Sequence, residues 1–189
     1  MQLRGKYRQL RVLARSGYGA VVLCVNDENG TLVALKTFEG ADQKPLVRAV
    51  AVREAQLLRQ LDHPHIVQLH DLFRSRNNLY IILEYIQFNA LQLIQLHPNG
   101  MPIEQLQWLG KQLTSALAYM HSKKVLHRDI RPENILVSRD GVLKLADFGF
   151  SRHVPQLQEG RLTGYVCSRW YRAPELLLGS QYGAAADVW

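Results

Sequence analysis

Glu54 is the charged residue whose position says most about the chain. The segment 45–61 predicts a helix, and Glu54 falls within its apolar stripe. A carboxylate on the inward face of a helix is costly unless it pairs with a cation. The pattern therefore predicts a cationic partner for Glu54. The apolar stripe itself consists of Val47, Val50, Leu57, Leu58 and Leu61.

Asp129, Asn134 and Asp147 have a spacing that is unusual for polar residues of ordinary turns. Asp129 and Asn134 are five residues apart, and Asp147 follows a strand predicted at 142–145. A single residue of this kind would most often cap a turn or lie in a loop. Together the three indicate a functional segment, and the weakly periodic stretch 147–175 is long enough to be functional too.

The elements that must position these residues can be read from periodicity and turn residues. A small antiparallel sheet is predicted from strands at 7–13, 20–26 and 31–38, with Asn29-Gly30 as a hairpin signal, and two more strands are predicted at 66–73 and 79–84. An irregular linker is expected at 85–89. Beyond it we expect a helix at 103–120 and two short strands at 135–137 and 142–145, joined by Asp140-Gly141.

The composition excludes several classes of protein. The chain has 189 residues, 47% of them apolar, and no apolar run long enough to cross a bilayer, so no membrane association is expected. Two cysteines are too few for a disulfide framework, which favours the cytoplasm or the nucleus. The net charge of +7 lacks an aromatic stacking pattern, so we interpret it as solvated surface and expect no nucleic-acid partner.

Four short motifs give the chain a resemblance to a known family. They are Val33-Ala34-Leu35-Lys36, His127-Arg128-Asp129 with Asn134, Asp147-Phe148-Gly149, and Ala173-Pro174-Glu175. In this order they resemble the signature set of eukaryotic protein kinases. The stretches 147–152 and 169–175 look like those of the CMGC branch, which contains the cyclin-dependent-kinase-like and mitogen-activated-kinase-like serine/threonine kinases. The resemblance covers nearly the whole chain.

The resemblance implies an α+β fold with two lobes. The N-terminal lobe, 1–84, would contain an antiparallel sheet and one helix, and a hinge would cover 85–90. The C-terminal lobe, 91–189, would be mainly helical. Kinase domains are longer than this chain, so the resemblance also implies that the second lobe is truncated after the start of the helix called αF.

The resemblance assigns roles to the polar residues. Lys36 would bind the α- and β-phosphates of ATP and would be the cation that Glu54 needs, although a purely structural ion pair is the alternative. Asp129 would accept the proton of the substrate hydroxyl. Asn134 and Asp147 would hold Mg²⁺ ions. ATP and Mg²⁺ are thus the expected cofactors, and a protein substrate is the expected partner.

The same resemblance outlines an adenine pocket, with Leu83 as its gatekeeper. Backbone groups of Glu84 and Ile86 would bind the purine edge, because a strand that passes into an open linker leaves amide and carbonyl groups unpaired. Each apolar residue alone would be ordinary core, and only the set suggests a pocket. The complete set is Leu13, Gly19, Val21, Ala34, Lys36, Leu83, Glu84, Ile86 and Leu136.

The chain departs from the kinase pattern at two places. Ala14 and Ser16 stand where the family has glycine, and only Gly19 matches, which predicts weaker ATP positioning. Arg131 replaces the catalytic-loop lysine, and this exchange is not conservative. The expected function is transfer of the ATP γ-phosphate to protein serine or threonine, directed to sites before proline. The alternative is a pseudokinase, or a truncated fragment that acts through binding.

Regulation by phosphorylation is also expected from the resemblance. Thr163 and Tyr165 stand at the positions of the doubly phosphorylated pair of mitogen-activated kinases. Arg53, Arg128 and Arg152 match positions that could receive the phosphate of Thr163. An upstream activating kinase is therefore a further expected partner.

Overall fold

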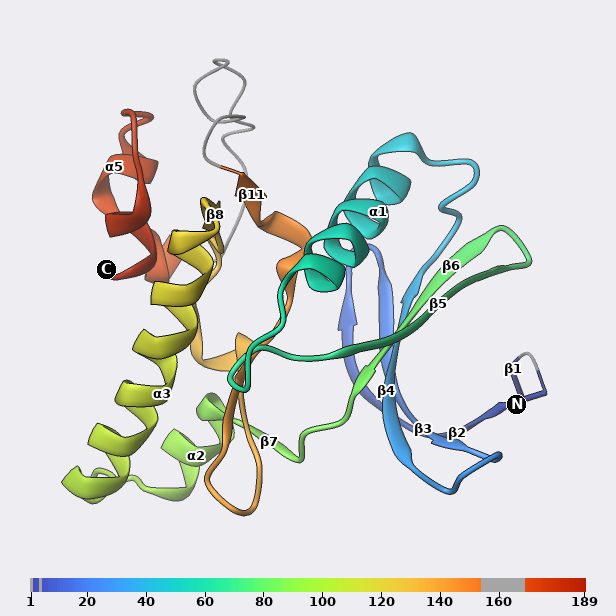
Figure 1. Cartoon of the computed structure of the whole chain (residues 1–189), viewed down its shortest axis with the longest axis horizontal. Helices are drawn as coiled ribbons and strands as arrows, with labels where there is room; N and C mark the ends of the chain where they lie inside the picture. The colour runs from blue at the N-terminus through green and yellow to red at the C-terminus, as the bar shows by residue number, and fades with distance from the viewer. Residues whose placement is uncertain (1, 4, 154–168) are drawn as a thin grey trace. The chain divides into compact units, whose positions relative to one another are not determined.

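The computed structural model describes residues 2–3, 5–153 and 169–189 (Figure 1). The chain divides into two compact units. The first consists of Met1–Asp62 and Val67–Ile86, and the second of His63–Ile66 and Gln87–Trp189. Within the described ranges, no helix is long and apolar enough to span a membrane.

The first unit is built on an antiparallel sheet of six strands. The strands are β1 (Gln2–Leu3), β2 (Tyr7–Ser16), β3 (Gly19–Asn26), β4 (Leu32–Phe38), β5 (Leu69–Ser75) and β6 (Asn78–Glu84), in the spatial order β1-β2-β3-β4-β6-β5. The turn between β3 and β4 is the predicted one, with Gly30 at φ +71°, a left-handed conformation that glycine adopts readily. The predicted fold of this half of the chain is confirmed.

The two faces of this sheet carry different side chains because successive residues of a strand point to opposite sides. One face holds a buried apolar cluster in which Phe73 stacks between Tyr7 and Tyr80, with ring centroids 6.0 and 5.0 Å apart. The complete cluster is Tyr7, Val22, Cys24, Val33, Leu35, Phe73, Tyr80 and Ile82. Val21, Ala34, Lys36 and Leu83, which are predicted to contact ATP, alternate with this cluster along their strands and belong to the other face.

One helix, α1 (Pro45–Gln60), packs against β4, β5 and β6 (Figure 1). Pro45 occupies the first turn, where its missing N–H group is not needed. Val47, Leu57 and Leu58 of the predicted stripe are buried in α1 together with Glu54, whereas Val50 is only half-buried. The helix therefore places a carboxylate beneath the centre of the sheet.

The segment His63–Ile66 belongs to the second unit although it lies between α1 and β5 in sequence. The N–H group of Leu145 donates to the carbonyl oxygen of His65 at 2.9 Å, and Ile66 forms a parallel bridge with Leu145. The predicted strand 66–73 was therefore wrong at its start, and β5 begins at Leu69. Apolar periodicity continues through these residues, but their backbone partners lie in another part of the chain.

The second unit is organised around the long helix α3 (Ile103–Ser122), which contacts two of its strands, β8 (Val125–Leu126) and β10 (Leu143–Leu145). The remaining described elements are β7 (Phe88–Asn89), α2 (Ala90–Leu96), η1 (Pro132–Asn134), β9 (Ile135–Val137), η2 (Phe148–Phe150), β11 (Arg152–His153), η3 (Arg169–Tyr171), α5 (Pro174–Leu177) and η4 (Ala184–Asp187). The strands form one sheet in the order β10-β9-β7 and a pair β11-β8. The predicted helix and both predicted strands are confirmed.

Candidate functional site

Lys36 and Glu54 form a two-point ion pair in the first unit. The Nζ atom of Lys36 lies 2.8 Å from Oε1 and 2.7 Å from Oε2 of Glu54. The Glu54 side chain is fully buried, and 13% of the Lys36 side chain is exposed. The structure thus supplies the cation that the sequence demands. The ammonium group also lies 5.3 Å from the centre of the Phe38 ring.

Strand register places the predicted adenine contacts on the face of the sheet that carries Lys36. Val21 pairs with Lys36 across β3 and β4, and Ala34 pairs with Leu83 across β4 and β6. Directly opposed residues share a face of the sheet. Leu13 lies in the irregular part of β2 between Val12 and Ala14. Of the other two apolar members of the predicted pocket, Ile86 follows β6 and Leu136 is in β9 of the second unit.

The turn between β2 and β3 is tighter than the sequence analysis assumed. Strand β2 extends to Ser16, which pairs with Gly19, so that only two residues connect the strands. Ala14 and Ser16 can stay in an extended strand, whereas glycine would weaken it. The Ser16 hydroxyl accepts from the N–H group of Tyr18 at 3.3 Å. The N–H group of Tyr18 is therefore already hydrogen-bonded to the serine side chain.

The linker after β6 contains the backbone groups that were predicted to bind the purine edge. The N–H group of Glu84 donates to the carbonyl oxygen of Gln68 at 3.0 Å, so this donor is used within the sheet. Within the described residues, the N–H and C=O groups of Ile86 take part in no hydrogen bond. The backbone groups of Ile86 are therefore candidates for contacts to a ligand edge.

Asp129 and Asn134 lie close together in the second unit. The Nδ2 atom of Asn134 donates to the carboxylate of Asp129 at 2.8 Å and to its carbonyl oxygen at 2.9 Å. Both residues are buried, at 4% and 9% exposure. Because the amide nitrogen faces Asp129, the amide oxygen of Asn134 remains as a ligand atom for a cation.

Asp147 is brought toward Asn134 by the β9–β10 hairpin. Leu145 pairs with Ile135, and the N–H group of Ala146 donates to the carbonyl oxygen of Asn134 at 2.9 Å. Asp147 itself has φ +65°, in the left-handed region that non-glycine residues seldom adopt. Such a conformation costs about 1–3 kcal/mol and is concentrated at functional sites. The hairpin thus puts Asn134 and Asp147 at one end of the same small sheet.

Asp187 holds the backbone of the loop 127–131, the predicted catalytic loop. Its carboxylate accepts from the N–H groups of His127 at 2.8 Å and Arg128 at 2.7 Å, and it lies 2.9 Å from Nε2 of His121. Burial alone would raise the pKa of Asp187, but the hydrogen bond from His121 and the nearby His127 and Arg128 groups lower it. The carboxylate is therefore kept charged inside the second unit.

His127 connects this loop to the segment that contains Asp147. Its Nε2 atom lies 3.0 Å from the carbonyl oxygen of Ala146, and its Nδ1 atom accepts from the N–H group of Asp129 at 3.3 Å. The ring meets that of Phe148 edge to face at 5.0 Å. A neutral imidazole that donates through Nε2 and accepts through Nδ1 fits both contacts.

Arg131 is engaged by an acidic neighbour. Its guanidinium group donates to Glu133 through Nε at 3.0 Å and through Nη2 at 2.6 Å. This bond lowers the pKa of Glu133. The planar fork of arginine supplies two separate N–H donors to this contact, one for each carboxylate oxygen. Arg131 is thus held by Glu133 in the structure described.

Gln112 supports the hairpin and was missed by the sequence analysis. It is buried in α3, where its Nε2 atom donates to the carbonyl oxygen of Gly141 at 2.9 Å and its oxygen accepts from the N–H group of Leu143 at 2.9 Å. A glutamine on the apolar side of the predicted helix was the available signal. It indicates a buried amide that needs partners.

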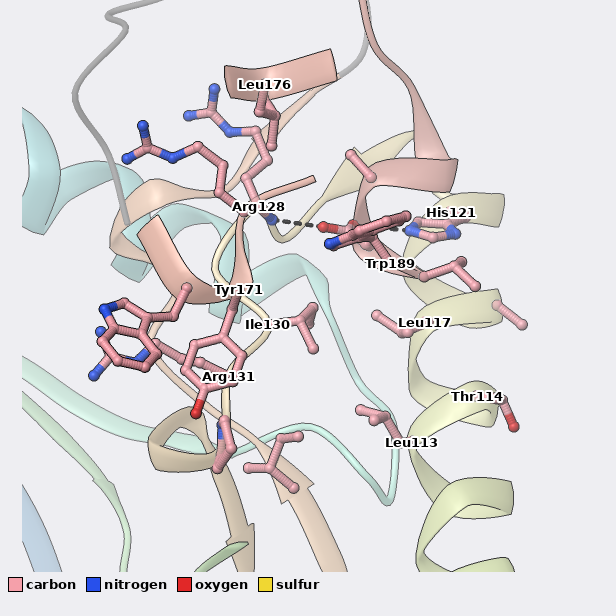
Figure 2. A pocket seen from close by; sticks show the side chains of 18 residues that line it. Leu113, Thr114, Leu117, His121, Arg128, Ile130, Arg131, Tyr171, Leu176 and Trp189 are labelled. Carbon is pink, nitrogen blue, oxygen red and sulfur yellow. Dashed lines mark hydrogen bonds and ion pairs between the residues drawn. The ribbon is translucent and has the colours of Figure 1, made fainter. Parts of the chain in front are cut away.

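A cavity of about 580 Å³ lies beside the catalytic loop, inside the second unit. Figure 2 shows Leu113, Leu117 and His121 of α3 on one side, and Ile130 and Arg131 on the other. The lining residues do not include Asp129, Asn134 or Asp147. Of the residues predicted for catalysis, Arg131 therefore lines the cavity, whereas Asp129 and the predicted metal ligands do not.

A model of the protein kinase domain matches residues 7–189. The chain belongs to the protein kinase family. It is 41% identical to mouse cyclin-dependent kinase-like 5 over 184 residues, which cover 97% of this chain and 20% of that protein. It is 41% identical to human cyclin-dependent kinase-like 2 over 185 residues, which cover 97% of this chain and 37% of that protein.

A third relative, mouse cyclin-dependent kinase-like 4, is 38% identical over 185 residues, which cover 97% of this chain and 54% of that protein. The chain thus spans between a fifth and about half of the length of these relatives. The resemblance to the CMGC branch is confirmed. These similarities extend over the whole set of motifs on which the resemblance was based.

Members of the protein kinase family use ATP and Mg²⁺, and the residues present here fit both. Carboxylate and amide oxygens are the ligands that Mg²⁺ prefers, and Asp147 and Asn134 supply one of each. Within the described ranges, no group of three or more His, Cys, Asp and Glu residues could hold a metal ion. A site with one carboxylate and one amide suits Mg²⁺, which usually keeps water and phosphate oxygens among its ligands.

The residues predicted for regulation are only partly within the structure. Thr163 and Tyr165 lie outside the described residues. Arg53 is in α1 of the first unit, whereas Arg128 and Arg152 belong to the second unit. Among the described residues, Arg128 bonds only to neutral oxygens through its side chain.

Proposed function

We propose that this chain transfers the γ-phosphate of ATP to serine or threonine hydroxyl groups of proteins, at sites followed by proline. The observation that carries the proposal is the contact between Asn134 and Asp129, because it places a predicted Mg²⁺ ligand against the predicted base. The family membership and the kinase motifs support the reaction type. The CMGC resemblance supports the choice of substrate residue.

The chain's own residues would divide the work as follows. Lys36, oriented by Glu54, binds the α- and β-phosphates, and Asp129 accepts the proton of the attacking hydroxyl. The bond from the γ-phosphorus to the bridging oxygen breaks as the bond to the hydroxyl oxygen forms. Asn134 and Asp147 would hold Mg²⁺, which would neutralise charge on the phosphate oxygens.

Peptides with matched sequences test this proposal. We expect Mg²⁺-dependent phosphorylation of a Ser-Pro peptide, less of the Ser-Ala peptide, and none of the Tyr-Pro peptide. Asp129→Asn is the inactive control. ATP binding without transfer to any peptide would favour the alternative, a pseudokinase that acts through binding. Equal rates for the Ser-Pro and Ser-Ala peptides would contradict only the proposed preference for proline, and not the transfer to serine.

We further propose that phosphorylation of Thr163 by an upstream kinase raises this activity. The neutral bonding partners of Arg128 support the proposal, because they leave its positive charge available to an anion. Replacing Thr163 by alanine should abolish activation by an upstream kinase, measured as the ratio of rates before and after treatment. Tyr165→Phe tests the second predicted position in the same assay.

We propose the cytoplasm or the nucleus as the location of the chain, because neither of its cysteines stands in a disulfide pattern. Cys24 is a free, buried thiol, and burial raises its pKa to about 11. Imaging of a tagged full-length protein in cells tests this location. A signal confined to the secretory pathway would contradict it.

A further inference from the structure

Arg128 has a backbone conformation that its surroundings must maintain. Its φ angle is +68°, in the left-handed region that side chains with a Cβ atom rarely occupy. The residue directly precedes Asp129, the predicted base. Strained conformations persist only where several contacts determine them. The contacts of Arg128 therefore bear on the position of Asp129.

The side chain of Arg128 donates hydrogen bonds to two residues, Phe150 and Tyr182. Its Nε atom donates to the carbonyl oxygen of Phe150 at 2.7 Å, and Nη2 donates to the same oxygen. Its Nη1 atom donates to the hydroxyl oxygen of Tyr182 at 2.8 Å. These bonds use three of the five N–H donors of the guanidinium group. Tyr182 is the only side chain among these acceptors.

Tyr182 comes from a part of the chain that is distant in sequence. It lies between α5 and η4, 54 residues beyond Arg128, and five residues before Asp187. Asp187 fixes the backbone N–H group of Arg128, while Tyr182 fixes its guanidinium group. The segment 182–187 thus holds both ends of Arg128. Phe150 adds the segment that follows Asp147.

We propose that Tyr182 is a positioning residue for the catalytic loop: its hydroxyl group orients Arg128 and thereby keeps Asp129 in place. The inference rests on the proposed phosphoryl transfer for its catalytic consequence, but not for the contact itself. A tyrosine suits this role because its hydroxyl is a neutral acceptor. A carboxylate at this position would also orient Arg128 but would neutralise its charge.

The variant Tyr182→Phe removes the hydroxyl oxygen and keeps the ring. Tyr171→Phe is the matched control, because the Tyr171 hydroxyl makes no hydrogen bond within the part of the chain that the structure describes. The first measurement is the exchange of the Arg128 Nη1 protons with water, because Nη1 is the atom that donates to Tyr182; it is followed by NMR in the wild type and both variants. We expect exchange at least about tenfold faster in Tyr182→Phe and unchanged in Tyr171→Phe. Unchanged exchange in Tyr182→Phe would overturn the proposal, whether or not the chain transfers phosphate.

The second measurement separates positioning from a merely structural effect. In Tyr182→Phe, we expect kcat for the Ser-Pro peptide to fall about tenfold while KM for ATP stays the same, since Arg128 is not assigned a nucleotide contact. The midpoint of thermal unfolding serves as the structural readout. A loss of kcat that disappears once the assay temperature is lowered below the onset of unfolding would overturn the positioning role. If the wild type transfers no phosphate, the proposed function is wrong. The proton exchange would still show whether Tyr182 binds Arg128.

Discussion

Both carboxylate oxygens of Glu54 lie within 2.8 Å of the ammonium group of Lys36, although Glu54 is fully buried. The pair joins the centre of β4 to the inner face of α1. A buried ion pair adds little net stability, because both charges lose water when they are buried. Removing one partner is costly, since the other remains buried without a counter-charge.

Replacement of Lys36 by methionine should therefore affect stability as well as activity. We expect Lys36→Met to abolish phosphate transfer and to lower the free energy of unfolding by about 3–5 kcal/mol. The double variant Lys36→Met with Glu54→Leu should regain most of the stability but no activity. Lys44→Met, at an exposed lysine, is the control. Denaturant titrations and peptide assays give both readouts, and an active Lys36→Met variant would contradict the role of Lys36.

Asp147 is expected to control the Mg²⁺ dependence of nucleotide binding. In Asp147→Asn a neutral amide replaces a carboxylate, which a hard cation prefers. The stimulation of ATP binding by Mg²⁺ should disappear, as measured by titration with and without the metal. Asp140→Asn, in the exposed hairpin turn, should keep the wild-type response. Equal Mg²⁺ stimulation in both variants would show that Asp147 is not a ligand.

Gly19 has a steric role that Gly17 lacks. A Cβ atom at Gly19 would lie 2.1 Å from the carbonyl oxygen of Thr37, and its φ of +151° disfavours other residues. At Gly17 nothing lies within 4 Å of such an atom. Gly19→Ala should therefore lower the free energy of unfolding by about 1–3 kcal/mol, whereas Gly17→Ala should change it little. Thermal unfolding compares the two, and equal midpoints would contradict the packing at Gly19.

Gln112 should contribute to stability through its two backbone partners. Gln112→Leu leaves the carbonyl oxygen of Gly141 and the N–H group of Leu143 without their hydrogen bonds. We expect a loss of about 2–4 kcal/mol, measured by urea unfolding. Gln105→Leu, at an exposed position of the same helix, is the control. A loss of the same size at both positions would argue against a specific contribution of Gln112.

The lowered pKa of Asp187 predicts a dependence of stability on pH. Because the folded state favours the charged carboxylate, its contribution is complete above the ordinary pKa of 3.8 and is lost as the pH falls through the lower folded value. The free energy of unfolding should therefore differ between wild type and Asp187→Asn by a constant amount from pH 7 to about pH 5. The difference should shrink below that range. A difference independent of pH down to acid unfolding would refute this assignment.

Local sequence patterns predicted most of the elements. The helix around Glu54 was expected at 45–61 and is found at Pro45–Gln60, and the strand 135–137 was predicted at its observed bounds. Periodicity is a local property, so it could fix these segments without knowledge of their partners. The start of β5 was predicted wrongly for the same reason. Ile66 continues the apolar pattern but pairs with Leu145, which periodicity does not reveal.

For the candidate site too, the sequence predicted one part and the tertiary structure revealed another. The sequence by itself determined which side chains are the candidates for the chemistry, because the kinase motifs are linear. It also predicted that Glu54 needs a cation, because a buried charge cannot stay unpaired. Only the tertiary structure decided which groups hold those residues. Gln112 bonds the β9–β10 hairpin, and Asp187 and Tyr182 hold Arg128 from more than fifty residues away. Hydrogen bonds need donor and acceptor within about 3 Å, and such proximity between distant segments exists only once the chain has folded.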